Sequence, residues 1–301
     1  MNNEPSEYVC CNVCGSDTPQ LLLAAPPVPQ LPGRPLGVVR CRTCGLVYRN
    51  LRQNPASVRR YFEQEAEVGL APDWIAGRKK VFAEHLILLE SFRRNNRILD
   101  VGAGHGFFLR ACADRGWDCY GVESSRPAVD FARRHGALNL ACGAFEEAIY
   151  PDEPFDAVTF LNVLEFLPDP KKALRKVHEL LRPGGAVTVR FSNAAFHVAA
   201  YRFFLSLGRF YKKLNRVDLA VIHLYAFDKN SITRLLLETG FTEIKVSWTP
   251  LSWTTTSHER IGNWRKLACK LLYACACFFH LVSFKRLLIS PSLVAIASKG
   301  G

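Results

Sequence analysis

One short run constrains the fold of this 301-residue chain more than any other: RILDVGAGHGFFL, at Arg97–Leu109. Its first five residues form a short β-type run, and a helical pattern follows the glycines. Glycine is needed between them because the backbone must turn sharply and let a ligand approach without a Cβ in the way. The run therefore predicts a strand, a glycine-rich binding turn and a helix, as in α/β proteins.

The spacing of these glycines separates two classes of cofactor. A dinucleotide-binding turn is spaced GxGxxG, whereas this run reads DxGxGxG with Asp100 on the strand. A carboxylate there disfavours a pyrophosphate and suits S-adenosylmethionine, which carries an ammonium and a sulfonium and no phosphate. The next expected strand, Asp118–Glu123, ends in an acid that can accept both ribose hydroxyls. The pattern therefore favours S-adenosylmethionine.

Further runs extend this pattern along the chain. They are ILDVGAGHGFFL (98–109), Glu123, FDAVTFLNVLEFLPDP (155–170), LRPGG (181–185), HLYAF (223–227) and LLLETGF (235–241). In this order they resemble the class I S-adenosylmethionine-dependent methyltransferases, and the resemblance covers nearly everything from Trp74 onward. It implies an α/β fold: a Rossmann-like, seven-stranded sheet with helices on both faces. An antiparallel pair, Thr242–Trp248 and Ser292–Ser298, would close the sheet.

The resemblance also implies which residues bind the cofactor. It assigns the methionine part to Asp100, Gly102 and Gly104, with Ala103 and Gly106 in the same loop. It assigns the ribose to Glu123, with Ser124 beside it. It places Ala144 and Phe145, after an expected strand at Leu138–Cys142, next to the adenine. It places Asn162 and Val163 at the sulfonium and the substrate entrance.

One position departs from the family pattern: the His that follows its Leu-Glu pair is Phe166 here. The protein therefore either does without that His, uses another base, or has lost activity. If a hydroxyl is methylated, a base must take its proton at neutral pH, and histidine suits that role. His223 is the first candidate for this catalytic residue, ahead of His197, Glu165 and Tyr201.

Four cysteines form a second motif near the start of the chain. Cys11 and Cys14 in CNVCG match Cys41 and Cys44 in CRTCG. Two such pairs supply four thiolates to one tetrahedral Zn²⁺, so they predict a structural zinc ribbon. Cys10 is an alternative to Cys11, which we favour because CNVCG mirrors CRTCG. The Pro-rich segment Leu21–Pro35 is expected as the loop between the knuckles.

These motifs divide the chain into three parts: a zinc-ribbon-like module at 1–52, a linker and helix at 53–73, and a methyltransferase domain at 74–301. The net charge of +12 is concentrated in two acid-free segments within the last part, Gly184–Val217 and Arg260–Gly301. They contain basic, apolar inserts at about 194–217 and 260–288. Such inserts favour an anionic partner, and they fit either interfacial helices or a substrate lid and dimer surface.

The sequence thus predicts transfer of a methyl group to a small or medium acceptor. The expected acceptor, an anionic one, is a hydroxyl of a sugar in a nucleotide- or lipid-linked glycan intermediate. RNA comes second because the fourth strand ends in NVLEF rather than in Asn/Asp-Pro-Pro-aromatic, and a non-catalytic cofactor-binding scaffold is a third alternative. No secretory signal or bilayer span is expected. The protein is therefore expected in the cytoplasm, with peripheral contact at the inner membrane face through 267–288, and as a homodimer.

Overall fold

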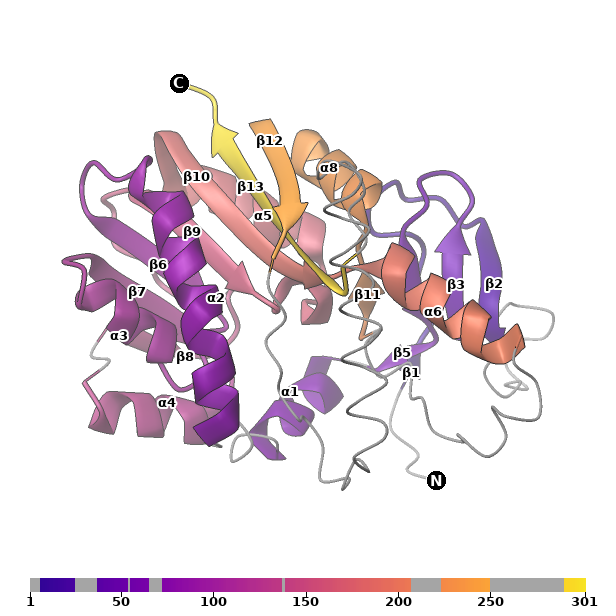
Figure 1. Cartoon of the computed structure of the whole chain (residues 1–301), viewed down its shortest axis with the longest axis horizontal. Coiled ribbons are helices and arrows are strands. Elements are labelled where there is room, and N and C mark those ends of the chain that lie inside the picture. Colours follow the sequence, from indigo (N-terminus) through magenta and orange to yellow (C-terminus); the bar gives the residue numbers. More distant parts are fainter. Residues whose placement is uncertain are drawn as a thin grey trace.

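A computed structural model describes residues 6–24, 37–53, 55–64, 72–136, 139–206, 223–249 and 290–301. Of the three sheets in these residues, a large one spans most of the molecule and a smaller, four-stranded one lies at its side (Figure 1). The helix expected within 53–73 is observed as α1 (Pro55–Gln64). Residues 65–67 lie outside the described residues.

The large sheet has seven strands in the order β12-β13-β10-β9-β6-β7-β8. The strands are β6 (Arg97–Val101), β7 (Asp118–Glu123), β8 (Leu140–Cys142), β9 (Phe155–Leu161), β10 (Leu181–Ser192), β12 (Phe241–Trp248) and β13 (Ser292–Lys299). The strands from β10 to β8 pair in parallel, and β13 pairs antiparallel with both β10 and β12. The predicted class I sheet and its closing antiparallel pair are confirmed.

Helices cover both faces of this sheet. One face carries α2 (Pro72–Glu90), α3 (Phe107–Ala113) and α4 (Arg126–Arg134), and the other carries α5 (Pro170–Leu180) and α8 (Lys229–Glu238). Apolar side chains alternate along the strands and fill both interfaces. Leu86 of α2 packs on the face that contains Ile98, whereas Leu174 of α5 packs on the face that contains Leu99.

The smaller sheet has the order β11-β4-β3-β2. Its strands are β2 (Pro19–Ala24), β3 (Gly37–Cys41), β4 (Val47–Asn50) and β11 (Tyr225–Ala226), and the short pair β1 (Ser6–Glu7) with β5 (Arg52–Gln53) lies beside it. The expected loop at Leu21–Pro35 is wrong over Leu21–Ala24. This apolar stretch forms β2 because it pairs with β3, Leu21 opposite Val39.

The first basic insert begins as a helix on the smaller sheet. Helix α6 (Ala194–Ser206) buries Ala194 and Val198 against Val38, Val47 and Ala226 (Figure 1). The rest of this insert, residues 207–217, and the whole insert at 260–288 lie outside the described residues. Among the helices described, none is long and apolar enough to cross a membrane.

Three histidines, of which His85 is buried and His197 and His223 are half-buried, make the fold sensitive to acid. Burial lowers the pKa of His85, His197 and His223 to about 4, so each is neutral in the folded protein at pH 7. His85 and His197 also hydrogen-bond the carbonyls of Val81 and Pro291 through one ring nitrogen. Because an unfolded histidine titrates near pH 6.5, the unfolded chain binds more protons than the folded one between pH 6.5 and 4.

We expect these three histidines to lower the free energy of unfolding as the pH drops through this window, through uptake of up to three protons on unfolding. Urea unfolding at a series of pH values from 7.5 to 4.5 measures this slope. A double variant, His85→Gln with His197→Gln, should flatten the slope even where it lowers stability at pH 7.5. An equally steep slope in the double variant would contradict the assignment.

Candidate functional site

The glycine turn after β6 lies across the end of β7. The amides of Gly102 and Ala103 donate to the carbonyl of Val122, at 2.8 and 3.1 Å. The amide of Gly104 donates to Glu123 Oε2 at 2.9 Å. Gly106 has a φ of 73° and precedes the first residue of α3. The turn is therefore fixed against the neighbouring strand, with both predicted acids at its base.

Glu123 organises the loop that follows its own strand as well. Its Oε1 accepts from the amide of Ser125 at 2.8 Å and from the hydroxyl of Ser124 at 3.3 Å. A carboxylate has about four acceptor positions, so these bonds and the one from Gly104 leave room for a further donor. The acid predicted to bind a ribose is thus held rigidly at the carboxyl end of β7.

Asp100 is buried at the end of β6, with 2% of its surface exposed. Burial raises the pKa of its carboxyl to about 7, and the nearby charge of Glu123 adds to this shift. The hydroxyl of Thr159, which donates to Asp100 Oδ1 at 2.5 Å, and the charge of Arg78 both oppose it. A buried carboxyl of raised pKa is poised to ionise fully when a cationic group binds beside it.

The first two glycines of the turn differ in the space around them. A Cβ on Gly102 would lie 2.4 Å from Val163 Cγ2, whereas a Cβ on Gly104 would meet nothing within 4 Å. Both residues have positive φ, 72° and 53°. Gly102 therefore lets β6 and the turn after β9 approach each other, and Gly104 keeps open the space that a cofactor would need.

This difference predicts opposite outcomes for two matched substitutions. Gly104→Ala should cost about 1–2 kcal/mol of stability for its left-handed backbone and weaken S-adenosylmethionine binding at least about tenfold. Gly102→Ala should cost clearly more stability because it adds a clash with Val163. Thermal unfolding and calorimetry distinguish them. Unchanged binding by the Gly104 variant would show that the open space is not the cofactor site.

Asn162 and Val163 form the turn after β9, next to the glycine turn. Asn162 has a φ of 63°, which is uncommon outside glycine and is often found at functional sites. Its Oδ1 accepts from Arg190 and, at 3.4 Å, from Arg78, and its amide donates to Glu165 Oε1 at 3.4 Å. The predicted substrate entrance is therefore flanked by two arginines.

Sequence reasoning missed Arg78 and Arg190. Arg78 lies on α2 and Arg190 near the end of β10, and burial lowers their pKa values to about 10 and about 9. Both still carry a charge at neutral pH. Nothing in the sequence marks either one, because a single arginine in an apolar strand, or one that begins a basic run in a helix, has no distinguishing pattern.

The residues expected near the adenine follow β8. Ala144 is exposed. The ring of Phe145 is buried and packs against Phe160 and Tyr150, while its carbonyl accepts from Tyr150 and Lys176. The Phe145 ring belongs to the core beneath the sheet, so a cofactor at this loop would meet backbone and Ala144 rather than the ring.

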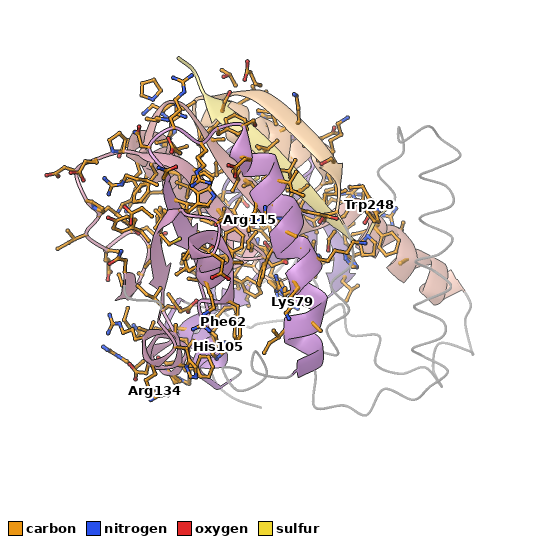
Figure 2. All side chains as sticks on the ribbon, turned by 60° about the vertical axis from the view of Figure 1, so that its left-hand side comes forward. Phe62, Lys79, His105, Arg115, Arg134 and Trp248 are labelled. Carbon is orange, nitrogen blue, oxygen red and sulfur yellow. The ribbon has the colours of Figure 1, made fainter. Side chains whose placement is uncertain are left out.

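His223 lies beside Phe166, the position that departs from the family pattern. The centroid of its ring is 3.9 Å from that of Phe166. The Phe166 ring in turn makes an edge contact with Phe62 of α1, with 4.8 Å between the ring centroids. Figure 2 shows Phe62 and His105 in the lower part of the view, and Lys79 on α2. His197 hydrogen-bonds Pro291, and the side chain of Tyr201 lies outside the described residues.

The four predicted zinc ligands come together. The sulfur atoms of Cys11, Cys14, Cys41 and Cys44 all lie within 4.8 Å of one another. Tetrahedral coordination at about 2.3 Å places thiolates roughly 3.8 Å apart, so the donor set fits one Zn²⁺. Cys10 is exposed and is not a member of this cluster.

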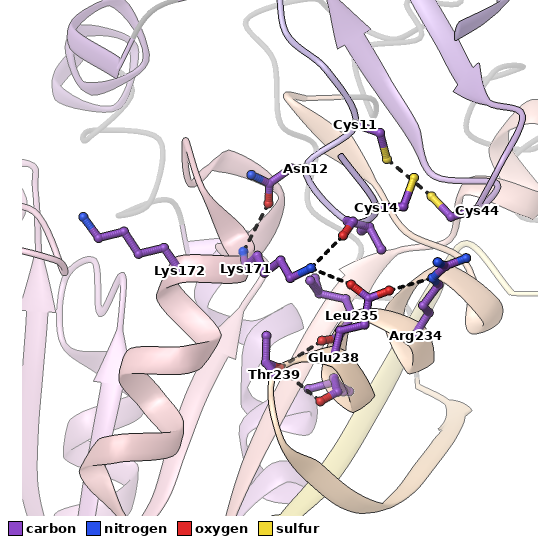
Figure 3. Close-up of polar contacts among 12 residues, drawn as sticks. Cys11, Asn12, Cys14, Cys44, Lys171, Lys172, Arg234, Leu235, Glu238 and Thr239 are labelled. Carbon is purple, nitrogen blue, oxygen red and sulfur yellow. Dashed lines mark hydrogen bonds and ion pairs between the residues drawn. The ribbon is translucent and has the colours of Figure 1, made fainter. Parts of the chain in front are cut away.

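The cysteine cluster is joined to the large sheet's helices (Figure 3). Lys171, in the first turn of α5, donates from Nζ to the carbonyl of Val13 at 2.9 Å and to Glu238 Oε2 of α8 at 2.5 Å. Its backbone amide donates to Asn12 Oδ1 at 3.2 Å. Cys11 and Cys41 also share one continuous core with Leu174 of α5.

The sequence of the chain matches a known protein family. A family described as a methyltransferase domain matches residues 74–246, more than half of the chain. The chain therefore belongs to this family of methyltransferase domains.

Two curated relatives are both ubiquinone biosynthesis O-methyltransferases. The one from Alkalilimnicola ehrlichii is 42% identical over 98 residues, 30% of this chain and 39% of the relative. The one from Coxiella burnetii is 28% identical over 145 residues, 44% of this chain and 62% of the relative. The chain thus matches less than two thirds of each relative's length.

A solved structure shows the same fold. It is a SAM-dependent methyltransferase from Thermotoga maritima, 20% identical, with a TM-score of 0.51. The match covers 80% of this chain and 99% of that one.

Proposed function

We propose that this chain is a class I S-adenosylmethionine-dependent methyltransferase that methylates a hydroxyl of a small or medium acceptor. The observation that carries the proposal is the arrangement at the edge of the large sheet. Asp100 and Glu123 flank a turn in which a Cβ on Gly104 would meet open space. The family of methyltransferase domains to which the chain belongs supports this function.

The charges at this edge match the amino-acid end of S-adenosylmethionine. That end carries an ammonium and a carboxylate, and the chain offers Asp100 and Arg78, which interact electrostatically with each other. We propose that Asp100 receives the ammonium and Arg78 the carboxylate. Glu123 then accepts from the ribose hydroxyls, while Asn162 and Val163 border the sulfonium.

Bound S-adenosylmethionine supplies a methyl group made electrophilic by the sulfonium. On transfer of this methyl group to the acceptor oxygen, the electron pair of the carbon–sulfur bond would stay on sulfur and the hydroxyl proton would have to leave. The chain's part is to align the acceptor, exclude water and take the hydroxyl proton. His223 is our candidate for the proton acceptor because its ring lies against Phe166, the position at which the family pattern has its His.

His223→Gln should reduce methyl transfer about 100-fold or more, the usual contribution of a general base, and leave the affinity for S-adenosylmethionine unchanged. Because the pKa of His223 is about 4, its protonation should produce no inflection in the wild-type rate between pH 6 and 8. His135→Gln, at an exposed histidine after α4, is the matched control. A rate that survives in the His223 variant would remove this residue from the reaction.

The acceptor is tested by label transfer. The relatives are named O-methyltransferases of ubiquinone biosynthesis, which supports oxygen as the methylated atom but names no sugar. In this experiment, labelled S-adenosylmethionine is incubated separately with nucleotide-sugar, lipid-linked sugar, quinol-type and RNA fractions. Label in a sugar fraction would support the predicted glycan acceptor. Label in the quinol fraction would replace it, and label in RNA would overturn the small-molecule proposal.

We further propose that Cys11, Cys14, Cys41 and Cys44 hold one structural Zn²⁺ and that 1–52, 53–73 and 74–301 are the units of the chain. A cytoplasmic location, a homodimer and a peripheral membrane contact through 267–288 are proposals too, and that segment lies outside the described residues. Liposome flotation with anionic vesicles, of the full chain against a deletion of 267–288, tests the contact. Equal bound fractions would exclude it.

A further inference from the structure

We infer that the cysteine module (residues 7–24 and 37–53) positions the acceptor side of the site, whereas cofactor binding depends on the large sheet and on helix α2. We call residues 164–169 and 223–227 the acceptor wall. The inference rests on the proposed function, which makes this the side of the acceptor. It assigns the metal-binding part of the chain a role in the reaction that neither the family nor the relatives' names supply.

The strongest observation is the strand β11, which belongs to the sheet of the cysteine module. Tyr225 and Ala226 pair with Tyr48 and Val47 of β4. The amide of Arg49 donates to the carbonyl of Leu224 at 2.9 Å, which continues this pairing toward His223. The candidate base therefore precedes a strand of the cysteine module rather than a strand of the large sheet.

Further hydrogen bonds join the two parts of the acceptor wall to each other and to the module. The amide of Leu224 donates to the carbonyl of Glu165 at 3.1 Å. Arg52 of β5 donates to the carbonyl of Pro168 at 2.7 Å and to the hydroxyl of Tyr225, which itself donates to Pro168 at 2.9 Å. Arg52 thus connects the module to both parts of the wall.

A second connection starts within the first cysteine knuckle. Asn12, which lies between Cys11 and Cys14, donates to Asp169 Oδ1 at 3.0 Å. Asp169 is the N-cap of α5 and also accepts from the amide of Lys172 at 2.9 Å. The end of the wall is therefore fixed by a residue whose own position depends on the knuckle.

The cofactor residues have a different support. Asp100 and Glu123 end β6 and β7, adjacent parallel strands of the large sheet. The first part of the acceptor wall, 164–169, instead follows β9, and its Phe166 contacts His223 of the second part. Strand pairing in the large sheet thus fixes the positions of Asp100 and Glu123, whereas hydrogen bonds from the cysteine module help to fix the acceptor wall.

Metal binding stabilises the cysteine module, and through it the acceptor wall. A module this small has little core of its own, so the free energy of metal binding supplies much of its folding free energy. Removing the metal should loosen β4 and, through the pairing with β4, β11 and His223. The cofactor turn should keep its conformation because Gly102, Ala103 and Gly104 are bonded to β7.

Hydrogen–deuterium exchange on the full chain, with and without one equivalent of Zn²⁺, tests the inference. Chelation should accelerate amide exchange at 224–227 and 165–169 at least about tenfold and leave exchange at 98–104 and 121–123 unchanged. The dissociation constant for S-adenosylmethionine should stay within about twofold, while label transfer falls. A module that merely braces the fold would weaken cofactor binding and accelerate exchange in both regions, which would overturn the inference.

Arg52→Gln provides a second test that leaves the cysteines intact. It removes the bonds to Pro168 and Tyr225, so exchange in the wall should rise with the metal still bound. Arg52 also pairs with Glu7 at 2.7 Å. Arg97→Gln is the matched control, because Arg97 makes a similar pair with Glu153 at 2.7 Å on the large sheet. Equal exchange in the wall of both variants would contradict the inference. Failure of the metal-loaded protein to bind S-adenosylmethionine would instead refute the proposed function. The exchange result would then still report whether the module holds residues 164–169 and 223–227 in place.

Discussion

Asp100→Asn should weaken the binding of S-adenosylmethionine about 100-fold and, at pH 8, stabilise the ligand-free protein. The loss of affinity corresponds to about 2.7 kcal/mol, the size of a charge-assisted hydrogen bond. The gain in stability follows from burial, which raises the pKa of Asp100 from 3.8 to about 7. Function and stability therefore conflict at this residue.

The sign of the stability effect follows from proton binding. Between pH 4 and 7 the folded protein retains a proton on Asp100 that the unfolded chain has lost, so this group lowers stability as the pH rises through that window. Asparagine keeps the shape, and its side-chain oxygen can still accept from Thr159. The melting temperature of the variant should exceed that of the wild type at pH 8, and the difference should shrink toward pH 4.

Asp114→Asn, at an exposed acid after α3, is the control for a change of charge alone. Calorimetric titration and thermal unfolding at pH 5 and pH 8 give both quantities. Binding at wild-type affinity by the Asp100 variant would contradict the assignment of the ammonium to this carboxyl. A variant less stable than the wild type at pH 8 would contradict the pKa argument.

Cys41→Ser with Cys44→Ser should abolish the binding of one equivalent of zinc and unfold the cysteine module. We expect a large loss, because structural zinc contributes on the order of 10 kcal/mol to the folding of small modules. Cys41 lies in the same core as Tyr225 and Phe227, so the loss should extend to β11. Elemental analysis and exchange at 224–227 measure the two effects.

Cys10→Ser is the control for this pair, because Cys10 is exposed and outside the cluster. It should retain one zinc and the stability of the wild type. Zinc loss in this variant would favour the alternative register, in which Cys10 replaces Cys11. A wild-type protein that contains no zinc would refute the metal centre.

The parts of the fold predicted from the sequence are those with a local cause. The glycine turn is one, because its three glycines all adopt positive φ, a conformation that other residues rarely take. The cysteine cluster is another, since two matching knuckles imply a shared metal. The strands β12 and β13 differ from the expected bounds by a single residue.

The parts that were missed depend on contacts distant in the sequence. Strand β11 has only two residues, and its partner β4 lies more than 170 positions earlier. A strand this short has no alternation of apolar and polar residues from which the pairing could be predicted. The convergence of Arg78 and Arg190 on Asn162 requires the register between α2 and β10. The core position of the Phe145 ring likewise depends on which face of the sheet Phe160 occupies.

The central claim is that the edge formed by Asp100, Gly104 and Glu123 binds S-adenosylmethionine for transfer of its methyl group. Calorimetric titration of the zinc-loaded chain with S-adenosylmethionine, followed by incubation of the labelled cofactor with the acceptor fractions, tests it most directly. We predict one binding site, competition by the demethylated product, and label in a hydroxyl-bearing small molecule. Absence of binding, or binding with no transfer to any fraction, would contradict the claim.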